Sequence, residues 1–219
     1  MEEVQTEENF QEAEQELSAL LKGRTPGLLE ARSNFAVLVP LVRGKSGYSL
    51  LYEVRARKMR RQPGEVCFPG GKMERDEAPV AAALRETEEE LGLKPESIRV
   101  LGQLDFLAPR GNSILYPVLG LVEEEALEHL TLNPAEVEEI FRVPLDWLLT
   151  AQPREYSYRL IPEMDEDFPY ELLGISTDYH WQIGRESGPI YPWEGKIIWG
   201  MTARITRHFL HLWREWNRT

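Results

Sequence analysis

Apolar and polar residues alternate along much of the chain in patterns that predict β-strands. The apolar, β-branched run at 36–42 and the segment 48–54 flank the turn sequence Gly44-Lys45-Ser46-Gly47, an arrangement that predicts a β-hairpin. Further strands are expected over 98–104, 115–122, 155–160 and 195–199. The acidic stretch 123–128 is interpreted as a solvated surface loop.

The pattern typical of a helix is strongest over 79–91, where apolar residues recur at spacings of three and four. Pro79 suits a first helical turn, and Gly92 suits the left-handed residue that ends a helix. Further helices are expected over 7–22, 134–141 and 202–216, and the aromatic residues of the last are expected to belong to the core. Mixed strands with helices before and after them predict the fold class α/β, as a sandwich.

The expected elements divide the chain into an N-terminal helical extension, 1–33, and a main domain, 34–219. The helix over 7–22 carries Phe10, Leu17, Leu20 and Leu21 near one stripe, and Gly23 is expected to end it. Such an amphipathic helix could pack on its own domain or on a second copy of the chain. A homodimer is therefore one of the alternatives that the sequence leaves open.

Charge and composition exclude several kinds of partner. Twenty-five Lys and Arg residues against 37 Asp and Glu give a net charge of −12, which argues against binding nucleic acid or an anionic membrane. No apolar run approaches the ~20 residues that span a bilayer. The first residues lack a secretory pattern, and Cys67 is the only cysteine, so a reducing cytoplasmic location is expected. A polyanionic substrate would have to be admitted by local basic residues or by bound cations.

The helix predicted over 79–91 has two chemically different faces. At 100° per residue its apolar face holds Val80, Leu84, Thr87 and Leu91, and its acidic face holds Glu86, Glu89 and Glu90. Like charges at these spacings weaken a helix, and hard cations such as Mg²⁺ or Mn²⁺ would relieve the repulsion. Arg85 lies beside Glu89 and could orient it by a charge-assisted hydrogen bond. Glu77 lies near the helix start, where its charge complements the macrodipole.

The whole segment 71–93 matches the Nudix box, G-x5-E-x7-R-E-U-x-E-E-x-G-U, in which U is a bulky aliphatic residue. The matching residues are Gly71, Glu77, Arg85, Glu86, Glu89, Glu90, Gly92 and Leu93, and the one departure is Thr87 at the first U position. A threonine there can return its hydroxyl to the backbone, so catalysis should be little affected. The alternative, an acidic helix that only faces solvent, does not account for the complete spaced set.

The chain therefore resembles the Nudix hydrolases, and the resemblance implies roles for these residues. Glu86 and Glu90 would be metal ligands, and Glu89 a further ligand or the base that orients a water molecule. Arg85 and Glu77 would form a pair that supports catalysis. The fold implied is an α/β/α sandwich around a mixed β-sheet.

The segment before the box resembles a second signature, that of the coenzyme A diphosphatase subgroup. Arg55-Ala56, Arg60, Gly64 and Phe68-Pro69-Gly70-Gly71 follow one another with three residues between each. The subgroup pattern begins with Leu-Leu-Thr, for which this chain has Leu51-Tyr52-Glu53, so Glu53 replaces the threonine. The segment 197–203 is also similar to this subgroup, and the resemblance extends over about 34–204.

The residues 55–61, Arg-Ala-Arg-Lys-Met-Arg-Arg, concentrate five positive charges in an acidic protein; we call them the basic segment. A 3′-phosphate such as that of coenzyme A needs a cluster of this kind. The substrate-binding candidates are Arg55, Arg57, Arg60, Arg61, Phe68 and Gly71, and the Gly70 carbonyl is a candidate metal ligand. The alternative is that these charges only offset the acidic surface.

The expected reaction is attack of a metal-activated water on one phosphorus of a diphosphate bridge. Coenzyme A or an acyl derivative would give 3′,5′-ADP and the corresponding 4′-phosphopantetheine. The alternatives are a diphosphatase for ADP-ribose or another nucleoside diphosphate linked to a group X, and a nucleotide-sensing module without catalysis.

Three other groups of residues are weaker candidates for chemistry. Cys67 is interpreted as a packed side chain rather than a nucleophile. His208 and His211 lie three residues apart on the last helix and are expected to be surface residues. A solvated face is also expected for the acidic residues of 134–141, although one of them could approach the metals. These acidic residues are Glu136, Glu138 and Glu139.

Overall fold

The computed structural model describes residues 13–23, 27–30, 33–109 and 112–218. Its strands are β1 (Ser33–Gly44), β2 (Gly47–Arg55), β3 (Val66–Cys67), β4 (Gly70–Lys72), β5 (Ile98–Gln103), β6 (Ser113–Glu123), β7 (Val137–Pro144), β8 (Arg154–Leu160), β9 (Gly184–Trp193) and β10 (Lys196–Ile198). Its helices are α2 (Pro79–Leu91), α3 (Leu145–Thr150), α4 (Tyr170–Leu173) and α5 (Gly200–Trp216), with short 3₁₀ turns η1 (Pro95–Ser97) and η2 (Glu124–His129).

The central sheet is mixed, with strand order β3-β2-β1-β6-β5. β1 and β2 form the predicted hairpin, whereas β1 and β6 run parallel from Ser33 opposite Ser113 to Arg43 opposite Glu123. β4 adds to β1, and β7 adds to β2. β1 is buried on both faces because a layer covers each side of the sheet, which a parallel pair requires.

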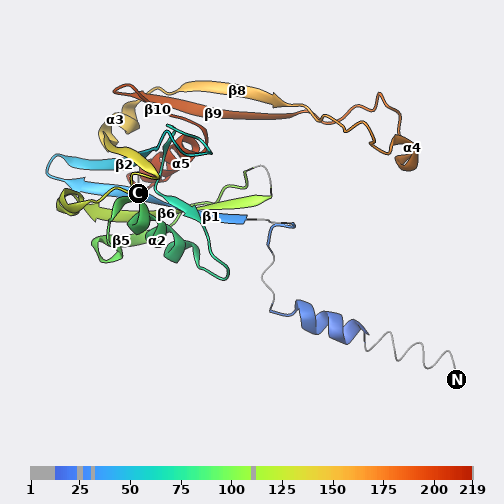
Figure 1. The fold of residues 1–219 in the computed structure, drawn as a ribbon, viewed down its shortest axis with the longest axis horizontal. Helices are drawn as coiled ribbons and strands as arrows, with labels where there is room; N and C mark the ends of the chain where they lie inside the picture. Colours follow the sequence, from blue (N-terminus) through green and yellow to red (C-terminus); the bar gives the residue numbers. More distant parts are fainter. Residues whose placement is uncertain (1–12, 24–26, 31–32, 110–111, 219) are drawn as a thin grey trace.

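Two helices cover the two faces of this sheet (Figure 1). On one face, Ala82, Ala83 and Leu91 of α2 pack against a cluster that includes Leu38 and Leu51. On the other face, residues of α5 pack against Val39, Leu50 and Tyr52; the α5 residues are Ala203, Ile205, Phe209 and Leu210. Full burial of each large apolar side chain stabilises the fold by about 1.5–3 kcal/mol. The predicted α/β sandwich is therefore confirmed.

The prediction of a helix over 134–141 is wrong. From Val137 the chain forms β7, which pairs antiparallel with β2, so that Val143 lies opposite Leu50. Buried Val137 and Val143 and the partly buried Phe141 anchor the strand against the sheet. Pairing with a neighbouring strand overrides the helix propensity that several glutamates suggested.

A long antiparallel pair, β8 and β9, extends beyond the body of the molecule and carries α4 near its end (Figure 1). The sequence predicted β8 and β10, but not β9 or α4. β9 was not predicted because it contains Gly and Pro residues, at 184, 188, 189 and 192, and both residue types are depleted in strands. It pairs with β8, which ends 24 positions before β9 begins, and with β10, which follows it directly in a hairpin.

The N-terminal helix is described over 13–21, and the expected part over 7–12 lies outside the described residues. Leu17, Leu20 and Leu21 are all exposed, by 58%, 71% and 59%. These exposed side chains do not show what the helix packs against. The N-terminal extension that ends at residue 33 and the homodimer both stay predictions. Within the described chain, no helix is both long and apolar enough to cross a membrane.

Candidate active site

Helix α2 begins and ends as the sequence predicts. Pro79 occupies its first turn, and Gly92 adopts a left-handed conformation with φ of 69° and donates its N–H to the Glu88 carbonyl. Thr87 is fully buried and donates its hydroxyl to the Ala83 carbonyl at 2.6 Å. Thr87, the one departure from the Nudix pattern, therefore satisfies its hydroxyl within the helix and lies on the face that packs against the sheet.

Glu90 is the most buried of the α2 carboxylates, with a relative exposure of 3%. The backbone N–H of Gly70 donates to its Oε2 at 2.7 Å. Gly70 has φ of 148°, and a Cβ there would lie 2.3 Å from the Ala36 carbonyl oxygen, so only glycine fits. Burial and, to a smaller extent, the nearby carboxylate of Glu53 raise the pKa of Glu90 to about 9, while the hydrogen bond from Gly70 opposes the shift.

Glu86 occupies space that a side chain at Gly71 would fill. A Cβ built on Gly71 would lie 2.2 Å from Glu86 Oε2, so this glycine lets the carboxylate lie against β4. Burial raises the pKa of Glu86, and the hydrogen bond from Arg85 opposes that shift. Glu86, Glu89 and Glu90 therefore differ in environment: Glu90 is buried, Glu86 is partly buried, and the Glu89 side chain is 56% exposed.

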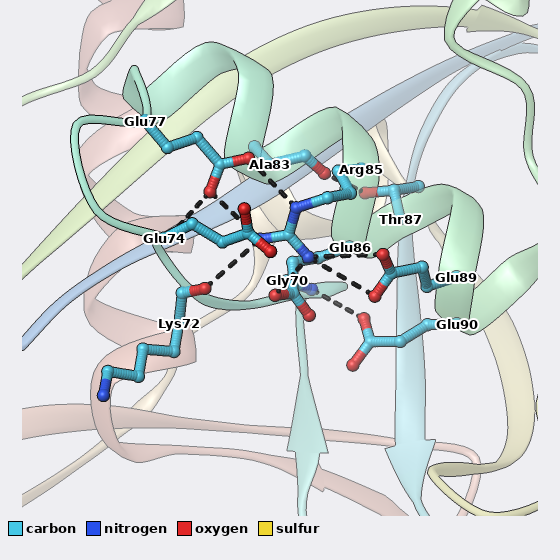
Figure 2. A network of polar contacts seen from close by, with 10 residues as sticks. All are labelled: Gly70, Lys72, Glu74, Glu77, Ala83, Arg85, Glu86, Thr87, Glu89 and Glu90. Carbon is cyan, nitrogen blue, oxygen red and sulfur yellow. Dashed lines mark hydrogen bonds and ion pairs between the residues drawn. The ribbon is translucent and has the colours of Figure 1, made fainter.

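Arg85 lies at the centre of a set of carboxylates and holds them in place (Figure 2). Its Nε and Nη2 donate to the two oxygens of Glu77 at 3.0 Å, and its Nη1 donates to Glu86 at 2.8 Å and to Glu89 at 3.3 Å. Glu77 precedes the helix and also accepts from the Glu74 N–H at 2.8 Å. The hydrogen bond between Arg85 and Glu77 lowers the pKa of Glu77 and raises that of Arg85. The predicted pairing of Arg85 with Glu89 is confirmed, and Glu77 is its strongest partner.

A cavity of about 610 Å³ lies beside these groups. Glu86, Glu90 and the backbone of Gly70 and Gly71 form one side, which we call the acidic wall. Elements remote in sequence complete the lining, among them Glu136 before β7 and the residues Trp199, Gly200, Met201 and Thr202 at the start of α5. The volume is in the range of sites for small molecules, about 300–1,000 Å³. The resemblance over 197–203 thus falls on residues that border the cavity.

The structure separates the basic segment into two groups. Within the described chain, Arg55 and Arg61 line the cavity, whereas Arg57 and Arg60 do not. The Arg57 side chain is 82% exposed and contacts Glu138 at 3.1 Å. Phe68 is buried and stacks on Tyr52 with ring centroids 4.8 Å apart, and it also borders the cavity. Of the predicted substrate-binding residues, Arg55, Arg61, Phe68 and Gly71 are therefore brought together.

Cys67, which lines the cavity, is hydrogen-bonded to the buried Glu53 behind it. The Cys67 thiol donates to Glu53 Oε1 at 3.1 Å, and burial raises the thiol pKa well above its ordinary value. Such a thiol is a poor nucleophile, as the sequence interpretation expected. Burial also raises the pKa of Glu53 to about 7. Sequence reasoning did not select Glu53, although its place at the threonine position of the subgroup pattern was a signal.

The two histidines of α5 lie apart from the cavity lining. His208 Nε2 is 3.4 Å from Asp105, and His211 Nε2 is 3.3 Å from Glu215. Across the described residues, no three His, Cys, Asp or Glu side chains are already arranged as a complete metal cage. Mg²⁺ does not require one, because it commonly keeps several waters and uses one or two carboxylates together with substrate phosphates. Glu86 and Glu90, partly desolvated beside a cavity, fit a cation of this kind.

Comparisons with known proteins agree with this geometry. The NUDIX domain family model matches residues 32–164. The chain is 38% identical to the peroxisomal coenzyme A diphosphatase NUDT7 of Mus musculus, over 79% of this chain and 67% of that protein. It is 35% identical to the mitochondrial coenzyme A diphosphatase NUDT8 of the same organism, over 92% of this chain and 88% of that protein.

Among solved structures, the Nudix hydrolase RenU of M. smegmatis is similar with a TM-score of 0.46 and 24% identity, over 53% of this chain and 73% of that one. The family match covers more than half of the chain and includes α2 with all its carboxylates. The chain belongs to the Nudix hydrolase family.

Proposed function

We propose that this protein hydrolyses the diphosphate bond of coenzyme A or its acyl derivatives, giving 3′,5′-ADP and (acyl-)4′-phosphopantetheine. The observation that carries the proposal is one cavity lined both by the acidic wall and by Arg55 and Arg61. The acidic wall suits cations that bind a diphosphate, and the two arginines suit a further phosphate. The coenzyme A diphosphatases NUDT7 and NUDT8 support the same substrate.

The proposed site uses Mg²⁺ or Mn²⁺, held by Glu86 and Glu90 with Glu89 and the Gly70 carbonyl as further candidates. When bound, such a cation supplies a polarised phosphorus and a water of lowered pKa. Arg85 keeps Glu86 and Glu89 in fixed positions, and Glu77 in turn fixes Arg85. Glu89 is exposed enough to accept a proton from a water molecule, so it is the candidate base.

Recognition of the substrate is assigned to four residues of the cavity lining. Arg55 and Arg61 would contact the 3′-phosphate, while Phe68 and Gly71 shape the cavity next to the diphosphate. The thiol end of coenzyme A is distant from the cleaved bond, so acyl derivatives fit the same mechanism. Arg57 and Arg60, outside the cavity lining, would contribute to the attraction of a polyanion over a longer range.

The experiment that tests the proposal is a substrate panel with product identification by mass spectrometry. Coenzyme A should be cleaved to 3′,5′-ADP only when Mg²⁺ or Mn²⁺ is added, and faster than 3′-dephospho-coenzyme A. Equal rates of cleavage for the two compounds would contradict the proposal that Arg55 and Arg61 bind the 3′-phosphate. Faster cleavage of ADP-ribose would favour the alternative nucleoside-diphosphate-X diphosphatase, and no cleavage of any compound would favour a sensing module.

A cytoplasmic location is also part of the proposal. It is supported by the single, reduced Cys67, which bonds to Glu53 instead of forming a disulfide. Imaging of the tagged full-length chain in its own cells would test it, and concentration in an organelle would contradict it.

A further inference from the structure

Glu53 is a buried carboxyl group that the proposed mechanism does not use. Its relative exposure is 1%, and burying an ionisable group at this depth is costly unless it is paired. Oε1 accepts the Cys67 thiol, but within the described residues Oε2 has no hydrogen-bond partner. Arg55, two positions along β2, does not form an ion pair with it in the described structure, and Arg55 Nε is itself buried without a partner. A buried polar oxygen without a partner needs an explanation, and a bound ion is one that the surrounding charges favour.

The position of Glu53 on β2 directs it to the α2 side of the sheet. Alternate residues of a strand share a face, so Leu51, Glu53 and Arg55 lie on one face of β2. Leu51 packs in the cluster that contains α2, whereas Leu50 and Tyr52 pack on the α5 side. Arg55 and Cys67, the neighbours of Glu53 along and across the strands, both line the cavity. Glu53 therefore lies beneath α2, directly behind the cavity lining that Arg55 and Cys67 form.

Glu53 and Glu90 repel one another. The two carboxylates interact electrostatically, and Glu136 adds a third negative charge nearby. Arg85, which neutralises Glu77, Glu86 and Glu89, makes no hydrogen bond or ion pair with Glu53 or Glu90 in the described chain. The carboxylates near the cavity thus form an outer part, balanced by Arg85, and an inner part, Glu53 and Glu90. The charge of the inner part is offset only by the electrostatic attraction of Arg55 to Glu53 and by the Gly70 N–H, without an ion pair in the described chain. A divalent ion that uses two carboxylates and water suits this inner part.

We propose that Glu53 is a further carboxylate of the metal centre, and that its unpaired Oε2 and Glu90 together bind a divalent cation on the β2 side of the cavity. This inference rests on the metal dependence in the proposed function. It gives a role to the residue by which this chain departs from the Leu-Leu-Thr pattern, since a carboxylate binds hard cations better than a hydroxyl does.

The test measures Mn²⁺ binding to the full chain without substrate, by isothermal titration and by electron paramagnetic resonance of free Mn²⁺. Glu53→Gln keeps the shape of the side chain and removes its charge, and it should weaken binding at one site by on the order of 10- to 100-fold. Glu88→Gln is the matched control, because it removes one charge from the outer side of α2, where Glu88 binds Lys94. Unchanged Mn²⁺ affinity and stoichiometry in Glu53→Gln would overturn the inference.

Thermal unfolding provides a readout that separates the cation from a structural role. In EDTA, Glu53→Gln should be at least as stable as the wild type, because a buried charge near Glu90 is removed. The rise in Tm on adding Mn²⁺ should be smaller in Glu53→Gln than in the wild type. Cys67→Ala removes the hydrogen bond to Glu53 but keeps the carboxylate. It should bind Mn²⁺ as the wild type does, and an equal loss in both variants would assign the effect to the hydrogen bond and overturn the inference.

A crystal of the wild type soaked in Mn²⁺ keeps the test independent of how the variants fold. Anomalous density should place Mn²⁺ within about 2.5 Å of a Glu53 oxygen. Density near Glu86 and Glu90 alone would overturn this inference and leave the proposed function intact. A wild type that binds no Mn²⁺ in solution would instead contradict the proposed function itself.

Discussion

Two parts of the cavity lining, the acidic wall and the arginines of the basic segment, carry opposite charges in very different surroundings. The acidic wall belongs to α2 and β4, and its central residue Glu90 is 3% exposed and held by a backbone N–H. The basic segment begins at Arg55, the last residue of β2, and continues into the connection that follows; of its charged residues, Arg55 and Arg61 line the cavity. Charges interact strongly where water is excluded and weakly where water and salt screen them. Changes in the acidic wall should therefore be severe and insensitive to salt, and changes in the basic segment mild and sensitive to salt.

Glu90→Gln should have the largest effect. Cation binding at the site stabilises the transition state by several kcal/mol, so its loss should lower kcat by about 10³-fold or more. The fold should persist, because glutamine can still accept the Gly70 N–H that Glu90 now accepts. The measurement is Mg²⁺-dependent hydrolysis of coenzyme A together with circular dichroism.

Glu88→Gln on the same helix is the control for that comparison. Glu88 bonds to Lys94, away from the cavity, and the variant should keep the wild-type rate. If Glu90→Gln kept full activity, the acidic wall would not hold the catalytic cation, and hydrolysis would have to take place at another site.

Arg85→Lys should have the second largest effect, because lysine has no fork of donors to hold three carboxylates at once. The wild-type guanidinium contacts Glu77, Glu86 and Glu89. We expect kcat to fall by about 10- to 100-fold, as for other groups that orient metal ligands. Titration with Mg²⁺ would show a higher concentration at half-maximal activity. An unchanged Mg²⁺ requirement would mean that Arg85 contacts the substrate instead of positioning ligands.

Arg61→Ala tests the smaller, salt-sensitive effect that we expect for changes in the basic segment. A charged hydrogen bond to a partly exposed phosphate should be worth about 1.4 kcal/mol, so kcat/KM for coenzyme A should fall by about tenfold. The value for 3′-dephospho-coenzyme A should hardly change, and the difference should shrink at high salt. Arg60→Ala, outside the cavity lining, is the matched variant and should affect both substrates equally. An equal fall in kcat/KM for both substrates in Arg61→Ala would contradict the proposal that Arg61 recognises the 3′-phosphate.

The parts of the site that could be predicted from the sequence are those that depend on residues close together in the chain. Helix α2 from Pro79 to Leu91 and its ending at Gly92 follow from rules that involve residues within one or two turns. The interaction of Arg85 with Glu89 is of the same local kind, and it was expected from the helical spacing.

Contacts between remote segments could not be predicted in this way. Glu53 and Glu90 lie 37 positions apart, and only the packing of α2 on the face of β2 brings their charges together. Glu136 was expected on a helix, whereas pairing of β7 with β2 brings it to the cavity. Both relationships depend on the register and packing of strands, which a single sequence does not encode locally.

The buried carboxylates also predict a pH dependence of stability for the metal-free protein. The pKa of Glu90 is about 9 in the fold, against an ordinary value of 4.5. Between these values the folded state retains a proton that the unfolded state has released, so stability falls as the pH rises through this range. Urea unfolding in EDTA at pH 5, 7 and 9 should show this fall, and Glu90→Gln should show a shallower one. A wild-type stability that rises over the same range would contradict the burial of Glu90 in its neutral form.

Thr87→Val should have the smallest effect, and it separates packing from chemistry on a single helix. The variant keeps the β-branched shape and loses the hydroxyl that Thr87 donates to the Ala83 carbonyl. That carbonyl lies four residues earlier in the helix, so it still accepts the backbone N–H of residue 87 and is not left unsatisfied. We therefore expect the free energy of unfolding to change by less than about 1 kcal/mol. Activity should stay within about twofold of the wild type, since 1.4 kcal/mol would be needed for tenfold. A tenfold loss of activity at unchanged stability would show that this hydroxyl helps to set the positions of Glu86 and Glu90, which lie one residue before and three residues after it on the helix.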